Sequence, residues 1–359
     1  MKRVLVVNPF GIGDVLFTLV MVESLRRAMP ELEIGFICNE RTEAIVRLDP
    51  SIDRTFVFNR DLFRRLWRKG PLFFAGKLRR LLGTVREFGY DTLIDVSLGR
   101  EYAFFGWWLG IRDRIGFDYR GRGTFLTRRV PFRGYADRPV AEAQLDLAAA
   151  LGLPAQRGAA RLPLRIPEED TAEVKRILRK AGFVPGEDLF LAVAPGGGRS
   201  WGANAVYKQW DPGRFAEAAG RFAAARRRVK VLLLGDRAER ELLDRTAAAL
   251  PGVPSLVLAG HPIARAAAFL RASAALLCND GGLLHLANAL GVPTVSVFGP
   301  VDERVYGPYG TDTRHAVVTE PVPCRPCYRD FRFPPCAHER RCLDLLPAEK
   351  VLRALEEII

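Results

Sequence analysis

Short apolar runs alternate with amphipathic stretches from one end of the chain to the other. An apolar run at residues 3–7 is followed by apolar residues at helical spacing, namely Val15, Leu19, Val22 and Leu25. Further apolar runs predict strands at 34–38, 55–58, 92–96, 189–194, 229–234, 255–258, 274–278 and 294–298. This alternation predicts an α/β fold in which parallel sheets are covered by helices on both faces.

The pattern loosens at residues 151–170, which hold three prolines and little periodicity, and a helical pattern resumes at 171–181. A chain of 359 residues also exceeds the usual size of one domain. We therefore predict two Rossmann-like domains that face each other across a cleft. The predicted divisions are 1–160, 161–346 and a C-terminal helix at 347–359 that packs back across the body of the protein.

Composition is that of an ordinary globular protein, with 48% hydrophobic and 26% charged residues. The sequence has no apolar run of about 18 residues, the length that a membrane span needs. The N-terminal apolar run is broken by polar residues and has no signal-peptide cleavage site. These features predict a cytoplasmic protein.

The formal net charge of +13 implies an anionic partner. Residues 60–86 hold nine basic residues and one acidic residue, interleaved with leucines, phenylalanines and Trp67. Such a stretch is typical of docking onto an anionic membrane surface, although a solvated helix pair with an apolar inner face has the same pattern. No nucleic-acid-binding pattern accompanies the charge, so we expect no nucleic-acid partner.

The first predicted strand ends in a glycine loop that carries Gly11, Gly13 and Asp14. A dinucleotide fingerprint requires a third glycine where Leu16 stands, so a dehydrogenase is not indicated. Asp14 begins a predicted helix at the carboxyl end of a strand, where catalytic groups collect in open sheets. The carboxylate either caps the helix or acts in catalysis. The paired glycines favour catalysis because they clear space beside it.

A second glycine loop, at 195–200, follows the strand predicted at 189–194. Its members Gly196 and Gly197 offer backbone NH groups to a diphosphate, and Ser200 closes the loop. Lys208 is either an ordinary surface lysine or a point charge for a phosphate. Asp236, at the end of another predicted strand, lies either in a solvated turn or against ribose hydroxyls.

The clearest site-like pattern lies at residues 278–300. Asp280, Gly281 and Gly282 begin a predicted helix, and the NH groups at such a helix start suit a phosphate. His285 shares a helical face with Gly281, while leucines and an alanine fill the opposite face. A lone histidine is more often structural than functional, but its position one turn from the glycines favours ligand contact.

Four of the six cysteines cluster near the C-terminus, as Cys324, Cys327, Cys336 and Cys342. In a cytosolic protein this spacing favours a structural metal, zinc or iron, over disulfides. Two disulfides and reduced thiols remain alternatives. A catalytic role is not expected, because the cluster follows the motif segments.

Three motifs together carry a family resemblance. They are Gly-x-Gly-Asp-Val-Leu at 11–16, Lys-x-Trp at 208–210 and Asp-x-Gly-x-x-His-x5-Gly-x-Pro at 280–293. With Phe-Gly-Pro at 298–300 and Pro-Tyr-Gly at 308–310, they resemble glycosyltransferase family 9, the ADP-heptose:lipopolysaccharide heptosyltransferases. The resemblance spans nearly the whole chain.

The resemblance implies a GT-B fold and an inverting transfer of heptose from ADP-heptose to a sugar hydroxyl of the lipopolysaccharide inner core. Asp14 would be the general base, and Lys208 would stabilise the leaving diphosphate. Asp280, Gly281, Gly282 and His285 would contact the donor. No cofactor would be required for catalysis, and the enzyme would act at the inner face of the inner membrane.

Two alternative functions fit the same architecture. One is a nucleotide-sugar epimerase, which would act on the donor without an acceptor. The other is an inactive relative that binds the membrane surface, although the joint presence of Asp14, Lys208 and Asp280 argues against it.

Overall fold

The chain divides into two compact units, Met1–Arg157 and Gly158–Ile359. The computed structural model describes residues 1–58, 65, 68, 70–135, 138–155, 157–159, 161–198, 201–250, 252–311 and 314–359. Each unit is built on a six-stranded sheet whose neighbouring strands are all parallel. The predicted α/β fold with two Rossmann-like sheets is confirmed.

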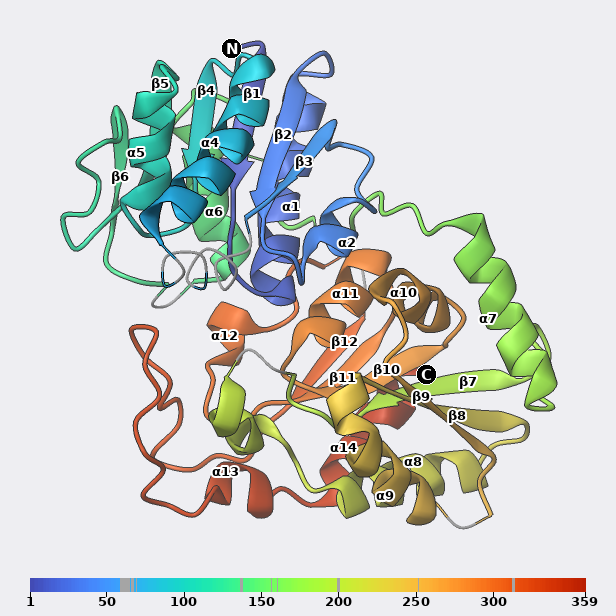
Figure 1. The fold of residues 1–359 in the computed structure, drawn as a ribbon. Coiled ribbons are helices and arrows are strands. Elements are labelled where there is room, and N and C mark those ends of the chain that lie inside the picture. The colour runs from blue at the N-terminus through green and yellow to red at the C-terminus, as the bar shows by residue number, and fades with distance from the viewer. Residues whose placement is uncertain are drawn as a thin grey trace. The chain divides into compact units, whose positions relative to one another are not determined.

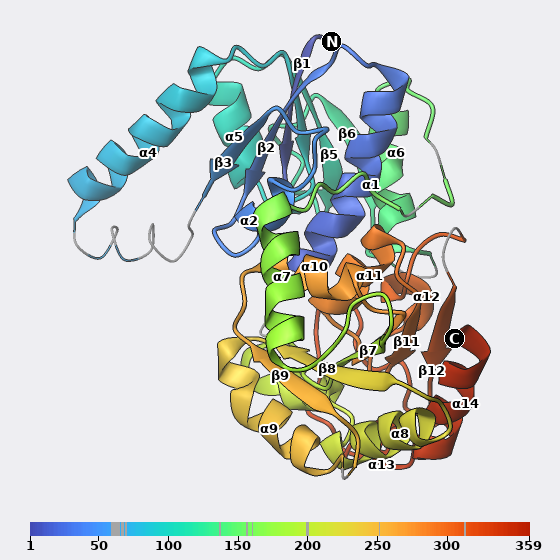
Figure 2. The same ribbon diagram turned by 90° about the vertical axis from the view of Figure 1, so that its right-hand side faces the viewer.

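The first sheet has the strand order β3-β2-β1-β4-β5-β6. Its strands are β1 (Arg3–Val7), β2 (Glu33–Cys38), β3 (Arg54–Val57), β4 (Thr92–Asp95), β5 (Asp113–Tyr119) and β6 (Arg128–Phe132). Helices α4 (Pro71–Glu87) and α5 (Glu101–Trp108) lie on one face of this sheet, and α1 (Ile12–Ala28) and α6 (Val140–Ala149) lie on the other (Figure 2). The short helix α2 (Glu43–Val46) packs beside β2 and β3. The strand order reverses between β1 and β4, which is where open sheets of this kind bind ligands.

The second sheet has the order β12-β11-β10-β7-β8-β9. Its strands are β7 (Leu189–Ala194), β8 (Val229–Gly235), β9 (Ser255–Ala259), β10 (Ala275–Asn279), β11 (Thr294–Val297) and β12 (His315–Val318). The corresponding reversal lies between β7 and β10. The carboxyl ends of these two strands lead into the second glycine loop and into Asp280.

Helices cover both faces of the second sheet (Figure 1). One group is α7 (Glu168–Lys180), α10 (Ile263–Arg271) and α11 (Gly282–Leu290). The other group is α8 (Pro212–Ala224), α9 (Arg240–Ala248), α13 (Arg341–Asp344) and α14 (Ala348–Ile358). Shorter elements are α12 (Glu303–Tyr306) and the 3₁₀ helices η1 (Gly202–Lys208) and η2 (Arg237–Glu239). The C-terminal helix α14 packs against α8, β11 and β12 of its own unit.

The strands expected from apolar runs are all present within one residue of their predicted bounds. Helix α7 begins three residues earlier than predicted, inside the stretch expected to be a linker. The sequence pattern missed β5, β6 and β12. The first of these carries charged residues, the second is an edge strand interrupted by Pro131, and the third is a four-residue edge strand, so none reads as a buried apolar run.

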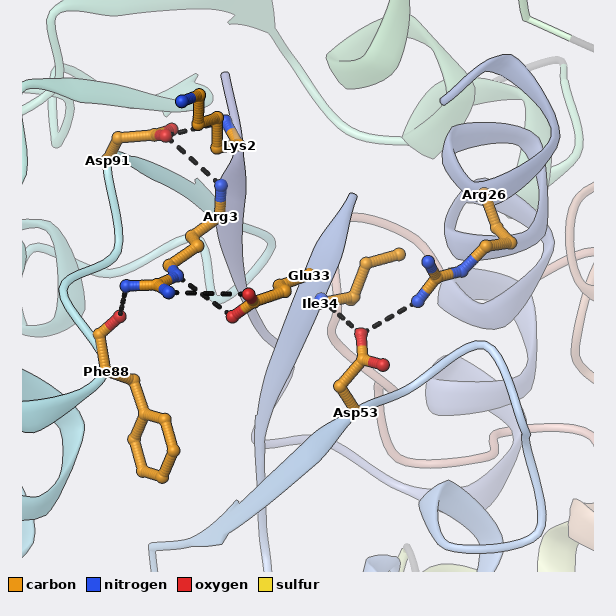
Figure 3. A network of polar contacts seen from close by, with 8 residues as sticks. All are labelled: Lys2, Arg3, Arg26, Glu33, Ile34, Asp53, Phe88 and Asp91. Atoms are coloured by element: carbon orange, nitrogen blue, oxygen red, sulfur yellow. Dashed lines mark hydrogen bonds and ion pairs between the residues drawn. The ribbon is translucent and has the colours of Figure 1, made fainter. Parts of the chain in front are cut away.

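Charged side chains tie the amino ends of the strands in the first unit (Figure 3). Asp91 Oδ2 accepts hydrogen bonds from the backbone NH groups of Lys2 and Arg3, at 2.7 and 3.1 Å. Arg3 Nε donates to Glu33 at 2.9 Å. Asp53 Oδ2 accepts from the backbone of Ile34 and from Arg26, at 2.7 and 2.8 Å. This network lies at the edge opposite the one that carries Asp14.

Among the described residues, no helix has the length and apolar character needed to cross a bilayer.

Trp210 is the largest fully buried side chain of the second unit, at 1% exposure. Its ring packs edge-on against Phe215 with centroids 5.0 Å apart, and its indole NH donates to the Leu346 carbonyl at 3.2 Å. The backbone NH of Trp210 donates to Asn279 Oδ1 at 3.0 Å. Trp210 therefore connects the core, the C-terminal segment and the end of β10.

Trp210→Ala should lower the free energy of unfolding by about 3–5 kcal/mol, because it leaves a large cavity in a packed core. Trp210→Phe keeps most of the ring volume but loses the indole NH, and should cost about 1–2 kcal/mol. Chemical denaturation followed by circular dichroism measures both. Equal costs for the two variants would contradict this account of the core.

Candidate functional site

The first glycine loop precedes helix α1, which begins after Gly11. Asp14 is half-buried in the first turn, and its Oδ2 accepts a hydrogen bond from the Gly11 NH at 3.2 Å. The carboxylate of Asp14 therefore caps the helix, which is one of the two roles predicted for it from the sequence. A cap of this kind also fixes the carboxylate in orientation, and the positive end of the helix dipole stabilises its charge.

Two asparagines that the sequence did not single out hold this loop in shape. Asn8 is fully buried, accepts from the Phe10 NH at 2.9 Å and donates to the Asp14 carbonyl at 3.0 Å. Asn39, after β2, donates to the Pro9 carbonyl at 2.8 Å and to the Phe10 carbonyl. The loop that contains Gly11 and Gly13 is thus fixed from two sides.

The centre of the second unit's candidate site is an ion pair. Lys208 Nζ lies 2.6 Å from Asp280 Oδ2, and the side chains are only 8% and 7% exposed. The two atoms are close enough for an ion pair, but the angles between the two groups are not those of a directed hydrogen bond. The Trp201 ring covers the ammonium group, with its centroid 4.8 Å from Nζ. Lys208 is therefore not an ordinary surface lysine.

The second glycine loop is held against the end of β10. Asn279 Nδ2 donates to the carbonyls of Pro195 and Gly196, at 2.7 and 3.2 Å. A Cβ on Gly196 would lie 2.0 Å from Glu239 Oε1, and one on Gly197 would lie 2.9 Å from the Ala205 carbonyl oxygen. Position 197 therefore requires glycine, whereas a side chain at position 196 would displace the Glu239 carboxylate from the loop. Ser200 lies outside the described residues.

Asp236 and Glu239 form a reciprocal cap at the end of β8. Asp236 Oδ1 accepts from the NH groups of Ala238 and Glu239 at 2.7 and 3.1 Å, and Glu239 Oε2 accepts from the Asp236 NH at 2.9 Å. Glu239 Oε1 also accepts from the Gly198 NH at 3.3 Å. The glutamate therefore contacts the glycine loop, and the Asp-x-x-Glu spacing is the signal that could have identified it.

Helix α11 begins at Gly282, directly after Asp280 and Gly281. A Cβ placed on Gly281 would meet no atom closer than 3.9 Å, so this position has room beside the glycine loop. His285, one turn along, is 6% exposed. Burial is the main cause that lowers its pKa. Asp280 opposes this shift and Lys208 adds to it, so the pKa lies at about 4. The imidazole is therefore neutral at neutral pH and adds no positive charge beside Lys208.

The predicted metal site at the four clustered cysteines is not supported. All four are described, and among the described residues no group of three or more His, Cys, Asp or Glu is arranged to hold a metal ion. Cys342 is buried in the hydrophobic core of the second unit. The Arg325 guanidinium fixes this segment by donating to the Gly299 carbonyl at 2.6 Å and pairing with Glu303 at 2.8 Å.

Comparison with known proteins identifies the family. The model of glycosyltransferase family 9 (heptosyltransferase) matches residues 78–332. Lipopolysaccharide heptosyltransferase 1 of Pseudomonas aeruginosa is 31% identical over 96% of this chain and 91% of its own length. The chain belongs to glycosyltransferase family 9.

Solved structures agree with this family 9 assignment at the level of the fold. A family 9 glycosyltransferase from Veillonella parvula superposes with a TM-score of 0.80, at 21% identity, covering 99% of this chain and 97% of that one. The Escherichia coli heptosyltransferase WaaC with ADP has a TM-score of 0.74 at 21% identity, covering both chains fully. The protein is therefore a glycosyltransferase, and neither the epimerase nor the inactive-relative alternative is favoured.

The depressed pKa of His285 makes stability depend on pH. The unfolded chain takes up this proton near pH 6.5, whereas the native glycosyltransferase takes it up only near pH 4. The stability that neutral His285 contributes is thus present above pH 6.5 and is lost as the pH falls towards 4. Relative to His285→Gln, the wild type should lose roughly 3 kcal/mol across this window. Denaturation curves measured at several pH values test this, and parallel pH profiles for the two proteins would contradict it.

The buried ion pair predicts strong coupling between its two residues. Lys208→Met or Asp280→Asn should each cost about 3–5 kcal/mol in the free energy of unfolding, because one charge stays buried without its partner. The double variant should recover most of that loss.

A matched control is the exposed pair Arg240–Asp244, whose atoms are 3.0 Å apart and whose side chains are 61% and 51% exposed. Arg240→Met should change the free energy of unfolding by at most about 1 kcal/mol. If Lys208→Met proved as mild as this control, Lys208 and Asp280 would not be a desolvated pair.

Proposed function

We propose that this glycosyltransferase moves a heptose from ADP-heptose to a sugar hydroxyl of the lipopolysaccharide inner core, with inversion at the anomeric carbon. The observation that carries the proposal is the buried Lys208–Asp280 pair between a glycine loop and the glycine-led start of α11. Relatives support the choice of substrate. The Pseudomonas relative is named for lipopolysaccharide heptosyl transfer, and WaaC has been solved with ADP and with ADP-2-deoxy-2-fluoro heptose.

The leaving group of this reaction is a diphosphate, which gains negative charge as the glycosidic bond to it breaks. Lys208 would stabilise that charge, and the NH groups at Gly281, Gly282 and the first turn of α11 would add hydrogen bonds. Asp280 and the Trp201 ring keep the ammonium group in place until the donor arrives. This arrangement supplies the positive potential through the protein alone, so we propose that catalysis uses no metal or other cofactor.

The remaining donor contacts would come from the end of the second sheet. Gly196 and Gly197 would offer their NH groups to the nucleotide, with Ser200 at the end of the same loop. Asp236 and Glu239 would accept hydrogen bonds from the ribose hydroxyls. His285, kept neutral by burial, would line the phosphate subsite without competing with Lys208 for the anion.

The first unit would provide the base. A sugar hydroxyl becomes a competent nucleophile when a carboxylate accepts its proton as it attacks the anomeric carbon. Asp14 is the candidate because Asn8 and Asn39 fix its loop and its own helix orients the carboxylate. Gly11 and Gly13 would allow the acceptor to approach closely.

The acceptor is the core and lipid A portion of lipopolysaccharide, so we propose a cytoplasmic enzyme at the inner face of the inner membrane. The basic stretch 60–86 would contact the anionic lipid surface. Most of residues 60–69 lie outside the described part of the chain. The described part of α4 carries four exposed basic side chains, namely Lys77, Arg79, Arg80 and Arg86.

Asp14→Asn should fold normally and bind donor, yet lose transfer by a factor of about 10²–10⁴, the usual contribution of a general base. The assay is formation of heptosylated acceptor from ADP-heptose, measured by mass spectrometry. Thermal shift with ADP-, UDP- and GDP-sugars tests donor choice, since a ligand that binds the native state raises its melting temperature.

Glu40 is an exposed carboxylate of the same unit that follows β2 and has no role in the proposed reaction, and Glu40→Gln is the control. Transfer by Asp14→Asn at the rate of this control would remove Asp14 as the base. Stabilisation by UDP- or GDP-sugars but not by ADP-heptose would overturn the proposed donor.

A further inference from the structure

Apart from exposed Glu101 in its first turn, helix α5 carries no charged side chain, yet it lies at the surface of the first unit. Its residues Tyr102, Phe105 and Gly106, with Leu109 just beyond, face inward and line a small apolar cavity shared with α4. Its outward side carries Phe104, Trp107 and Trp108 at the i, i+3 and i+4 positions of one helical face. A helix that is hydrophobic all round is normally covered on all sides.

The outward side chains are strongly exposed. Trp107 and Trp108 are 54% and 58% exposed, and Phe104 is 37% exposed. Phe125, from the loop between β5 and β6, joins them, with its ring centroid 5.2 Å from that of Phe104 and 5.8 Å from that of Trp107. We call these four residues the α5 aromatic patch.

The patch has a fixed shape. Arg114 Nε donates to the Phe125 carbonyl at 2.6 Å, and the same guanidinium donates to the Ile111 carbonyl just beyond α5. The loop that carries Phe125 is thereby tied to the end of the helix. The four rings therefore form one prearranged surface, which loses little conformational entropy when it is covered.

Exposed arginines surround the patch. Arg100 lies at the N-terminus of α5, and its guanidinium reaches the Gly121 carbonyl at 3.4 Å, so the loop that holds exposed Arg120 and Arg122 lies at that end. Arg112, also exposed, follows the C-terminus of the helix. The basic outer surface of α4 covers the same face of the sheet (Figure 2).

We propose that the α5 aromatic patch inserts into the interfacial region of an anionic phospholipid membrane, with the surrounding arginines on the lipid headgroups. Tryptophan suits this region because its ring is apolar while its NH remains hydrated. Arginines attract anionic lipids and keep a charged ring around the apolar centre. A second copy of the chain is a poorer occupant, because a symmetric contact would bring the two sets of arginines together.

This inference extends the proposed function, from which it takes only that the acceptor lies in a membrane. The patch would hold the first unit at the lipid surface by aromatic insertion, in addition to the electrostatic attraction expected of residues 60–86. Binding to lipid and transfer to acceptor are separate measurements, so one can fail without the other.

Co-sedimentation with vesicles is the test. Wild type should bind vesicles that contain phosphatidylglycerol, and bind pure phosphatidylcholine vesicles weakly. Trp107→Ser with Trp108→Ser should weaken binding to the anionic vesicles by about tenfold or more. Trp107→Phe with Trp108→Phe retains apolar area and should stay closer to wild type. Leu345→Ser removes an apolar side chain that is 59% exposed in the second unit, and should bind as wild type does.

Two further readouts keep the test independent of folding. In a Trp67→Phe background, which removes the tryptophan of the 60–86 stretch, lipids brominated near the headgroup should quench tryptophan fluorescence, and this quenching should be largely lost when Trp107 and Trp108 are also changed to serine. Transfer to a water-soluble acceptor fragment should be equal in wild type and the double serine variant. Vesicle binding by the double serine variant at the wild-type level would overturn the proposal. A wild-type dimer that dissociates in this variant, with lipid binding unchanged, would identify a self-association face instead.

Discussion

The second unit is organised around two opposite charges held 2.6 Å apart with almost no access to water. Taking Lys208 and Asp280 out of water is costly, and their mutual attraction offsets that cost only where the surroundings exclude solvent and supply no competing charge. Those conditions explain which side chains surround the pair. The Trp201 ring covers the ammonium group, and burial keeps His285 neutral. In the proposed reaction, a site of this kind would hold a cation ready for the anionic leaving group, with little reorganisation when the reaction occurs.

In both units, the candidate site residues follow the carboxyl ends of strands in a parallel sheet. In the first unit, a charged network ties the amino ends of the strands (Figure 3), and the carboxyl end of β1 leads into the loop before Asp14. In the second unit, the carboxyl ends of β7 and β10 supply the glycine loop and Asp280. Each of these positions adjoins the point where the strand order reverses. The backbone at that point diverges to either side, which leaves room for a ligand.

Asparagines, two of them buried, connect these edges to the loops they support. Asn8 and Asn39 do so in the first unit, and Asn279 joins the second glycine loop to the backbone of Trp210. An amide can donate and accept at once, so one side chain can satisfy two backbone groups that neither helix nor sheet satisfies. The outward aromatic side chains of helix α5, by contrast, stay exposed, because no other element of the described chain packs over them extensively.

The sequence determined the strands whose side chains are continuously apolar, the division into two sheets and the motifs of the family, because these are written in local periodicity and spacing. It also predicted chemical roles for Asp14, Lys208 and Asp280, which remain predictions. Only the tertiary structure decided that Lys208 pairs with Asp280, that Glu239 contacts the glycine loop, and that Cys342 is buried in the hydrophobic core. The edge strands β6 and β12 likewise escaped prediction. The physical reason is that burial, charge pairing and edge position depend on residues far apart in the chain, whereas periodicity records only what each segment does by itself.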